Sequence, residues 1–228
     1  CQQSLQLWLE SDGPYEKAQS LMCVGSAQGV LGNYPKAIEH QTEAIKLCRE
    51  TGNSNCEGTA LSGLGLIHTM AKDYRRAIEC FQLAIVISQS SKNSYNEAKH
   101  LHGLGATYLL LGDLPAAERF LLQSLQLQQS VGDRQGEAFV GAFLARVYRQ
   151  QGRLSESLDS LQKALAIIEQ QRQSLSGHSS QTSYFGRLHS HHEFYLDLLM
   201  QLHRESPTAG HAVTAFQASE RARARTLL

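Results

Sequence analysis

Cysteine and histidine are the residues of this chain whose types could carry chemistry, and their spacing decides which chemistry is open to them. The cysteines are Cys1, Cys23, Cys48, Cys56 and Cys80. Their odd number, the lack of a CxxC pair and the lack of Cys–His spacing argue against both a disulfide framework and a zinc site. We therefore expect reduced thiols that fill helix interfaces, as is typical of a cytoplasmic protein.

A cluster of histidines near the C-terminal end is the second candidate for chemistry. His189 and His192 are three residues apart and would share one face of a helix, with His191 between them. A metal site needs more ligands at fixed geometry, and only Glu193 offers a carboxylate nearby. We expect a partly exposed, histidine-rich helix face, with a metal site as the alternative.

No motif for catalysis or cofactor binding accompanies these residues. Neither GxGxxG nor GxxxxGK[ST] occurs, and no cysteine stands in a nucleophile motif. Lys+Arg and Asp+Glu both number 21, so the net charge of zero favours neither nucleic acid nor a membrane surface as a partner. The apolar runs are shorter than the ~20 residues that span a bilayer. We predict that this chain is not an enzyme and needs neither cofactor nor metal.

A basic stretch near the end of the chain leaves two interpretations open. Arg221, Arg223 and Arg225 alternate with alanines and threonine after Glu220. Nucleic-acid binding is one interpretation, but no aromatic residues are interleaved with these arginines. We favour a helix whose arginines meet acidic neighbours or a downstream domain.

The elements that must position all these residues follow a 40-residue repeat. Small residues recur at the same step without an insertion, as Gly25, Gly65, Gly105 and Ala145. A period between 20 and 50 residues is typical of a solenoid built from one supersecondary unit. Glycine in a helix costs up to ~1 kcal/mol relative to alanine, so its recurrence indicates that a facing helix passes too close for a side chain.

The unit over residues 54–93 shows what each repeat contains. Ser54 and Glu57 match a capping box, and a helix is expected over roughly 56–70. Lys72 and Asp73 stand where the neighbouring repeats have glycine followed by Asn, Asp or Arg, and a second helix is expected over roughly 74–91. Each repeat is therefore predicted to be a helical hairpin.

Several short motifs give these hairpins a family resemblance. They are Leu64-Gly65, Leu104-Gly105 with Tyr108, Gly112-Asp113, Ala117 and Ala84-Ile85. The pattern resembles the tetratricopeptide (TPR) signature, in the 40-residue subclass with extended helices. The resemblance implies an all-α fold: a right-handed TPR superhelix, or α-solenoid, of antiparallel helix pairs with an atypical C-terminal helical pair.

The expected organisation follows the repeat in both directions. Residues 1–17 resemble the second helix of a truncated repeat, which suggests that the chain is a fragment. The remaining parts are TPR 1 over 18–53, TPR 2 over 54–93, TPR 3 over 94–133, TPR 4 over 134–173, a loop over 174–183 and a C-terminal helical pair over 184–228.

The C-terminal pair carries a second resemblance. Its residues are Tyr184-Phe185, Tyr195 to His203 and Ala215 to Leu228. This pattern is similar to the segment that joins TPR arrays to CHAT domains in cyanobacterial-type proteins. A CHAT domain is a caspase-like peptidase module with a Cys–His dyad, so the resemblance implies a downstream CHAT domain in the full-length chain, absent from the residues given.

The first helix of each repeat is expected to line a concave groove that binds a partner. Counting from the packing glycines, the groove residues are Met22, Ser26, Thr59, Ser62, Leu66, Thr69, Lys99, His102, Ala106, Leu109, Phe139, Ala142, Arg146 and Arg149. An extended peptide or a helix with an acidic end would suit this mixture. Arg146 and Arg149 have the forked donors that bind a carboxylate, although both can equally be solvated or bonded to neighbouring helices.

Protein–protein recognition is the function that this sequence predicts. The array is expected to bind a protein or peptide in its groove and to act as the sensing or regulatory arm of a CHAT peptidase. Two alternatives remain: a structural scaffold that self-associates into a homo-oligomer, or an adaptor that binds an unrelated signalling protein.

Overall fold

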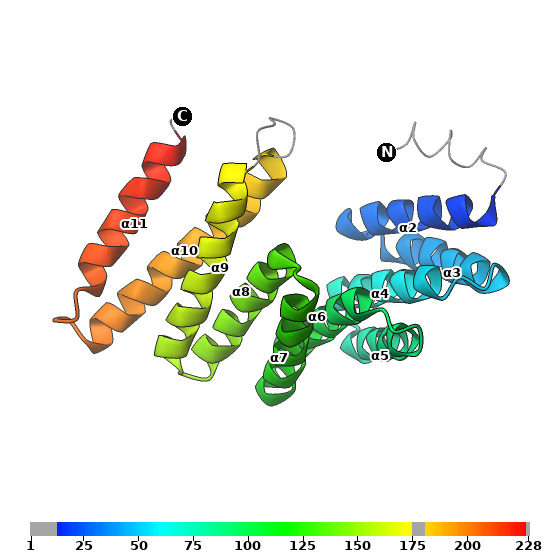
Figure 1. Ribbon diagram of the computed structural model, residues 1–228, viewed down its shortest axis with the longest axis horizontal. Coiled ribbons are helices and arrows are strands. Elements are labelled where there is room, and N and C mark those ends of the chain that lie inside the picture. Colours follow the sequence, from blue (N-terminus) through cyan, green and yellow to red (C-terminus); the bar gives the residue numbers. More distant parts are fainter. Residues whose placement is uncertain (1–12, 175–180, 227–228) are drawn as a thin grey trace. The chain divides into compact units, whose positions relative to one another are not determined.

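The computed structural model describes residues 13–174 and 181–226, and describes side chains over 13–171 and 190–220 (Figure 1). These residues form ten helices and no strand, as an all-α TPR superhelix requires. In order they are α2 (Pro14–Val30), α3 (Tyr34–Glu50), α4 (Ser54–Met70), α5 (Tyr74–Ser90), α6 (Ser94–Leu111), α7 (Leu114–Val131), α8 (Arg134–Gln150), α9 (Leu154–Ser174), α10 (Gln181–Glu205) and α11 (His211–Thr226). No helix in the described residues is long and apolar enough to cross a membrane.

The chain divides into two compact units between Asp133 and Arg134, and each is described by itself. In unit 1, helices pair as α2–α3, α4–α5 and α6–α7, while α3 also packs on α4 and α5 on α6. In unit 2, α8 pairs with α9 and α10 with α11, and α9 also packs on α10. We call the first helix of each hairpin its A helix and the second its B helix.

The predicted close approach at the recurrent glycines is confirmed. A Cβ added to Gly25 would lie 3.1 Å from the Ala37 carbonyl oxygen, and one on Gly65 would lie 3.0 Å from the Phe81 ring. A Cβ on Gly105 would lie 2.7 Å from Leu121 Cγ. Each A helix of unit 1 therefore meets its own B helix through a position that has no room for a side chain.

The helix caps lie one residue earlier than the predicted capping box. The Asn53 side chain accepts the Cys56 backbone N–H at 3.0 Å, and the Asn93 side chain accepts the Asn96 N–H at 3.0 Å. Ser54 is thus the first residue within α4 and not its cap. Asparagine can take the N-cap position because its side-chain oxygen is at least as good an acceptor there as the serine hydroxyl.

Three predicted helix ends also differ from the structure. Helix α2 begins at Pro14, four residues before the predicted start of TPR 1. The loop was predicted over residues 174–183. Ser174 belongs instead to α9 and residues 181–183 to α10, so both ends of the predicted loop are helical. Residues 1–12, predicted to be half of a truncated repeat, lie outside the described residues.

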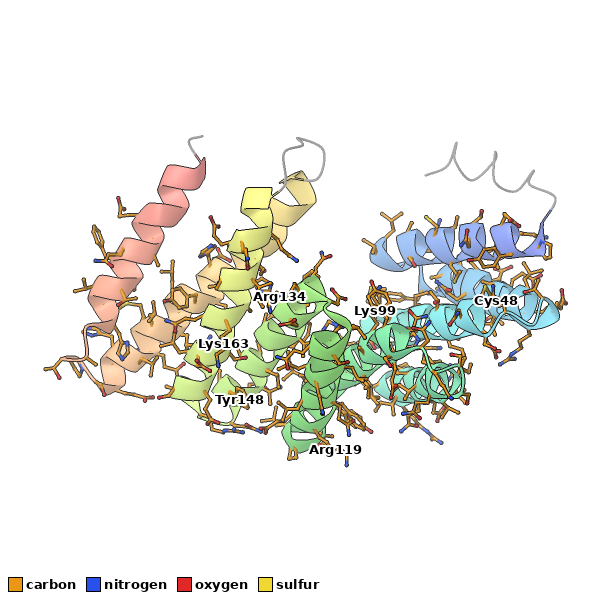
Figure 2. The ribbon with its side chains drawn as sticks, in the orientation of Figure 1. Cys48, Lys99, Arg119, Arg134, Tyr148 and Lys163 are labelled. Atoms are coloured by element: carbon orange, nitrogen blue, oxygen red, sulfur yellow. A yellow bond between two sulfur atoms is a disulfide. The ribbon has the colours of Figure 1, made fainter. Side chains whose placement is uncertain are left out.

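The prediction of reduced cysteines without a disulfide is wrong for one pair. Cys48 and Cys56 are joined by a disulfide with their Cα atoms 5.4 Å apart (Figure 2). Cys48 lies in the last turn of α3 and Cys56 in the first turn of α4, and the short turn between them places both inside the range that a disulfide spans. Cysteine number and motifs gave no sign of this, because the pairing depends on the hairpin geometry. Cys23 and Cys80 are free thiols.

Candidate partner-binding face

The A helices of unit 1 present one candidate surface for a partner. Helix α4 packs between α2 and α6, so equivalent positions of these helices follow one another from repeat to repeat. Of the predicted groove residues in unit 1, eight are exposed or half-exposed: Met22, Ser26, Thr59, Ser62, Leu66, Lys99, His102 and Ala106. We call these eight residues the A-helix face.

The polar side chains of this face are partly bonded within their own helices. The Ser26 hydroxyl donates to the Met22 carbonyl at 2.9 Å, and the Thr59 hydroxyl donates to the Asn55 carbonyl at 2.8 Å. Each hydroxyl oxygen keeps acceptor capacity for a donor from outside. The face therefore offers hydrogen-bond acceptors beside the apolar side chain of Leu66, which is 52% exposed.

One cation stands on this face. The Lys99 ammonium lies 4.3 Å from the centre of the Tyr95 ring, one turn earlier in α6, and Lys99 is labelled in Figure 2. A cation over an aromatic face is attracted to it by ~0.5–1 kcal/mol at an exposed site. Tyr95 thus holds the Lys99 charge against α6, where it is available to a negatively charged partner.

His102 contributes no charge to the face near neutral pH. Burial lowers the pKa of His102 from 6.5 to about 4, because the surrounding protein disfavours the protonated form. The imidazole is therefore neutral at pH 7 and acts as a hydrogen-bonding group. Lys99 remains the cation among the eight residues of the face.

Two of the residues predicted to line the groove in unit 1 are instead buried. Leu109 is part of the packed interior, and the Thr69 hydroxyl lies 3.0 Å from the Thr107 hydroxyl. This hydrogen bond joins α4 to α6. Their helical positions point toward the neighbouring helix, so these side chains stabilise the stack of A helices and are not open to a partner.

Helix α8 of unit 2 carries the remaining four predicted residues. Ala142 is buried in the core of this unit with Ala138 and Leu161, while Phe139 is half-buried. The Arg149 Nε donates to the Gln201 side chain at 3.0 Å, and its guanidinium lies 5.3 Å from the Phe194 ring centre. Both Gln201 and Phe194 belong to α10, so Arg149 is engaged with a neighbouring helix.

Arg146 is held in a similar way. Its guanidinium lies 5.2 Å from the Phe143 ring centre and 5.9 Å from the Phe194 ring centre. Burial lowers the pKa of Arg146, although a guanidinium stays protonated under all ordinary conditions. The sequence left open whether these arginines bind a partner's carboxylate or are bonded to neighbouring helices. In this structure Arg149 is hydrogen-bonded to α10, and both guanidinium groups lie against aromatic rings.

Three exposed side chains next to the A-helix face were not among the groove residues predicted from the sequence. Val30 and Leu110 follow Ser26 and Ala106 by one helical turn and are strongly exposed, and Tyr95 precedes Lys99 by one turn. A spacing of four residues from the predicted groove positions was the available signal for all three. Val30 and Leu110 extend the apolar part of the surface toward the C-terminal ends of α2 and α6, and Tyr95 extends it toward the N-terminal end of α6.

Neither a metal centre nor an activated nucleophile is found among the described residues. No group of three His, Cys, Asp or Glu side chains there is placed to hold a metal ion. Burial raises the pKa of the Cys80 thiol to about 11, which suppresses the reactive thiolate. His191 is buried in α10, whereas His192, expected on a partly exposed face, is half-buried, and the side chain of His189 lies outside the described residues.

Helical hairpins stacked at a fixed repeat, with close-packed glycines between A and B helices, define a TPR-type solenoid. The chain belongs to the family described as the MalT-like TPR region, which it matches over residues 1–227. Repeats of this kind generally serve as non-catalytic binding modules. Among curated proteins, no sequence matches the chain.

Solved structures share the fold at low sequence identity. A crystal structure of BtubC (BKLC) from P. vanneervenii is 18% identical, with a TM-score of 0.76 over 98% of this chain and 87% of that one. A putative kinesin light chain from Podosopora anserina with nearly identical TPR-like repeats is 15% identical, with a TM-score of 0.67 over 95% and 99%. The TPR sensor protein of the STAND class of signal-transduction ATPases from Pyrococcus horikoshii is 14% identical, with a TM-score of 0.64 over 90% of this chain and 32% of that one.

Proposed function

We propose that this chain is a protein–protein interaction module whose A-helix face binds a peptide segment of a partner protein. The observation that carries the proposal is the composition of the face, where apolar Leu66, the hydroxyls of Ser26 and Thr59 and the charge of Lys99 are open to solvent on successive A helices. Such a mixture suits a peptide, since apolar area supplies affinity while a few polar groups fix its direction.

The partner segment that fits this face is extended and carries both an apolar and an acidic side chain. The apolar side chain would cover Leu66, and the acidic one would meet the Lys99 ammonium that Tyr95 holds in place. For unit 2, taken by itself, we also propose Arg146 and Arg149 as carboxylate-binding residues, because a guanidinium stacked on a ring keeps N–H donors at its edge. Phe139 lies on the same helix, about two turns before Arg146.

The wider role that we propose is that of a sensing or regulatory arm of a larger protein. The resemblance of the C-terminal pair to CHAT-linked segments supports a caspase-like module as the regulated domain. The TPR sensor of the STAND ATPase is a precedent for such an arm. The sequence predicted a cytoplasmic location for the protein. The Cys48–Cys56 disulfide argues against that location, since disulfides are rare in the cytoplasm. Deletion of the array from a full-length protein should change its peptidase activity or substrate choice, and unchanged values would refute this role.

The binding proposal is tested by one matched pair of variants. Peptides selected on the chain from a random phage-displayed library are measured against Leu66→Arg and against Leu83→Arg. Leu66 and Leu83 are 52% and 53% exposed, so neither change disturbs the core, but Leu83 lies on the B helix α5. Leu66→Arg should weaken binding about tenfold or more, as the loss of a buried leucine contact of 1.5–3 kcal/mol requires.

The control variant decides what the result means. Leu83→Arg should leave the affinity unchanged. If Leu83→Arg weakens binding as much as Leu66→Arg, or if neither does, the A-helix face is not the binding surface. Light scattering of the free chain shows at the same time whether it self-associates, which is the scaffold alternative.

A further inference from the structure

Two hydrogen bonds fix the register between the A helices α4 and α6. Where the two helices begin, the Asn93 side-chain nitrogen donates to the Asn55 side-chain oxygen at 2.8 Å. Near the end of α4, the Thr69 and Thr107 hydroxyls lie 3.0 Å apart. Both pairs are separated by 38 residues in the sequence, so the two helices run side by side in the same direction with a constant register.

This register places Leu66 and the charge of Lys99 at different levels of the A-helix face. Leu66 of α4 is level with Leu104 of α6. The Lys99 ammonium lies against the Tyr95 ring, so it is level with the turn between these two residues. About seven residues of helix separate the two levels, which is about 10 Å at the rise of an α-helix. Since packed helices also lie about 8–10 Å apart, the leucine and the ammonium are about 14 Å apart along a diagonal of the face.

An extended peptide spans this diagonal in four residues. Its rise is about 3.3 Å per residue, so residues i and i+4 of the peptide lie about 13 Å apart. The side chains of i and i+4 also point to the same side of an extended chain, whereas those of i+3 and i+5 point to the opposite side from i. The length of the peptide and the direction of its side chains therefore select the same separation.

The charges near the diagonal favour a carboxylate at its Lys99 end. The carboxylates in the first turns of α4 and α6 are engaged with the B helices that precede them. Glu57 pairs with Arg49 of α3 at 2.6 Å. Glu97 accepts a hydrogen bond from the Gln89 side chain of α5 at 2.8 Å. No described carboxylate pairs with Lys99, so its charge is open to a partner.

We infer that the A-helix face selects an extended peptide whose apolar and acidic side chains are four residues apart, an inference that rests on the proposed binding of a peptide to this face. The apolar side chain covers Leu66, and the carboxylate meets the Lys99 ammonium that Tyr95 holds in place. Residues i+1 and i+3 of the peptide point away from the face and can vary. The spacing of the pair thus defines the ligand more sharply than its composition does.

Selection from a random phage-displayed peptide library tests the spacing directly. Peptides bound by the whole chain are sequenced, and pairs of one apolar and one acidic residue are counted at every spacing, relative to the unselected library. Pairs four residues apart should be enriched about two- to fivefold over pairs three or five apart, the gain that an exposed ion pair supplies. Insertion of one serine between the pair of a selected peptide should weaken its binding by the same factor.

A matched pair of charge reversals assigns the acidic preference to Lys99. Peptides selected on Lys99→Glu should lose the acidic residue and gain lysine or arginine at the same spacing of four from an apolar residue. Lys46→Glu makes the same change of charge at an exposed position of the B helix α3 and should keep the acidic preference. Circular dichroism checks that both variants stay folded.

Three outcomes would overturn the inference. Enrichment could be equal at all spacings, or the acidic preference could survive Lys99→Glu or be lost equally with Lys46→Glu. In the third outcome, enrichment would peak near nine residues, which is the spacing that covers about 14 Å in a helical ligand. In each case, peptide binding that Leu66→Arg weakens would leave the proposed function standing. Binding that Leu66→Arg does not weaken refutes the proposed function itself, so the two failures are distinct.

Discussion

His100 shows how a single buried side chain ties the stability of unit 1 to pH. It lies in α6, and neither of its ring nitrogens has a hydrogen-bond partner. Burial, with a smaller contribution from Lys99, lowers the pKa of His100 from 6.5 to about 4. The unfolded chain therefore takes up the proton first as the pH falls, so this residue removes stability between about pH 6.5 and pH 4.

Replacement of His100 by leucine should remove this part of the pH dependence. Between pH 7 and pH 5.5 the free energy of unfolding of the unchanged chain should fall by about 1 kcal/mol more than that of His100→Leu. Urea denaturation at the two pH values measures the difference, and His40→Leu on α3 is the control that should keep the full dependence. Equal slopes for the unchanged chain and His100→Leu would show that His100 is not buried as described.

At the residue scale, the sequence predicted which helix positions are closely packed better than it predicted which groove side chains are exposed. The recurrent glycines Gly25, Gly65 and Gly105 revealed close contacts because glycine in a helix has a cost that only packing explains. The same counting placed Thr69 in an open groove, whereas its hydroxyl is buried against Thr107. A helical position gives the direction of a side chain but not how closely the next helix approaches it.

At the scale of the elements, the α3–α4 turn is the place where the structure adds a covalent constraint. The disulfide joins Cys48 to Cys56 over a sequence separation of 8, and the Arg49–Glu57 ion pair at 2.6 Å joins the neighbouring residues. Closing so short a loop stabilises the folded chain by about 2–3 kcal/mol through the entropy of the unfolded state. The neighbouring exposed ion pair adds little by comparison.

Reduction of this disulfide should therefore lower the free energy of unfolding by about 2–3 kcal/mol. Urea denaturation with and without a thiol reductant measures the change, and the Cys48→Ser/Cys56→Ser variant should show no response to the reductant. Alkylation of the unfolded, unreduced chain should leave two of the five cysteines unlabelled. Labelling of all five would contradict the bridge and restore the prediction of reduced thiols.

The helices themselves were predictable because each carries its own signals. Residues with positive φ end the A helices, namely three glycines and, after α4, Lys72, and Asp73 and Asp113 cap the B helices that follow, as the sequence indicated. The pairing of Cys48 with Cys56 was not predictable in this way. It depends on where two helices meet in space, which no local pattern records.

At the scale of the molecule, the repeat explains why fold and function differ in how far they can be predicted. Residues at the A–B and B–A contacts recur every 40 positions, so one unit predicts the next. Residues on the A-helix face do not recur, since Ser26, Leu66 and Ala106 occupy equivalent positions. The repeat therefore identifies a binding module without naming its ligand.

The central claim is that the A helices of unit 1 form the binding surface, and amide hydrogen exchange with a selected peptide bound tests it most directly. Helices α2, α4 and α6 should gain protection on binding, greatest around Leu66 and Lys99, because the peptide excludes water and suppresses local opening there. Helices α3, α5 and α7 should exchange as in the free chain. Protection confined to these B helices, with α4 and α6 unchanged, would contradict the account.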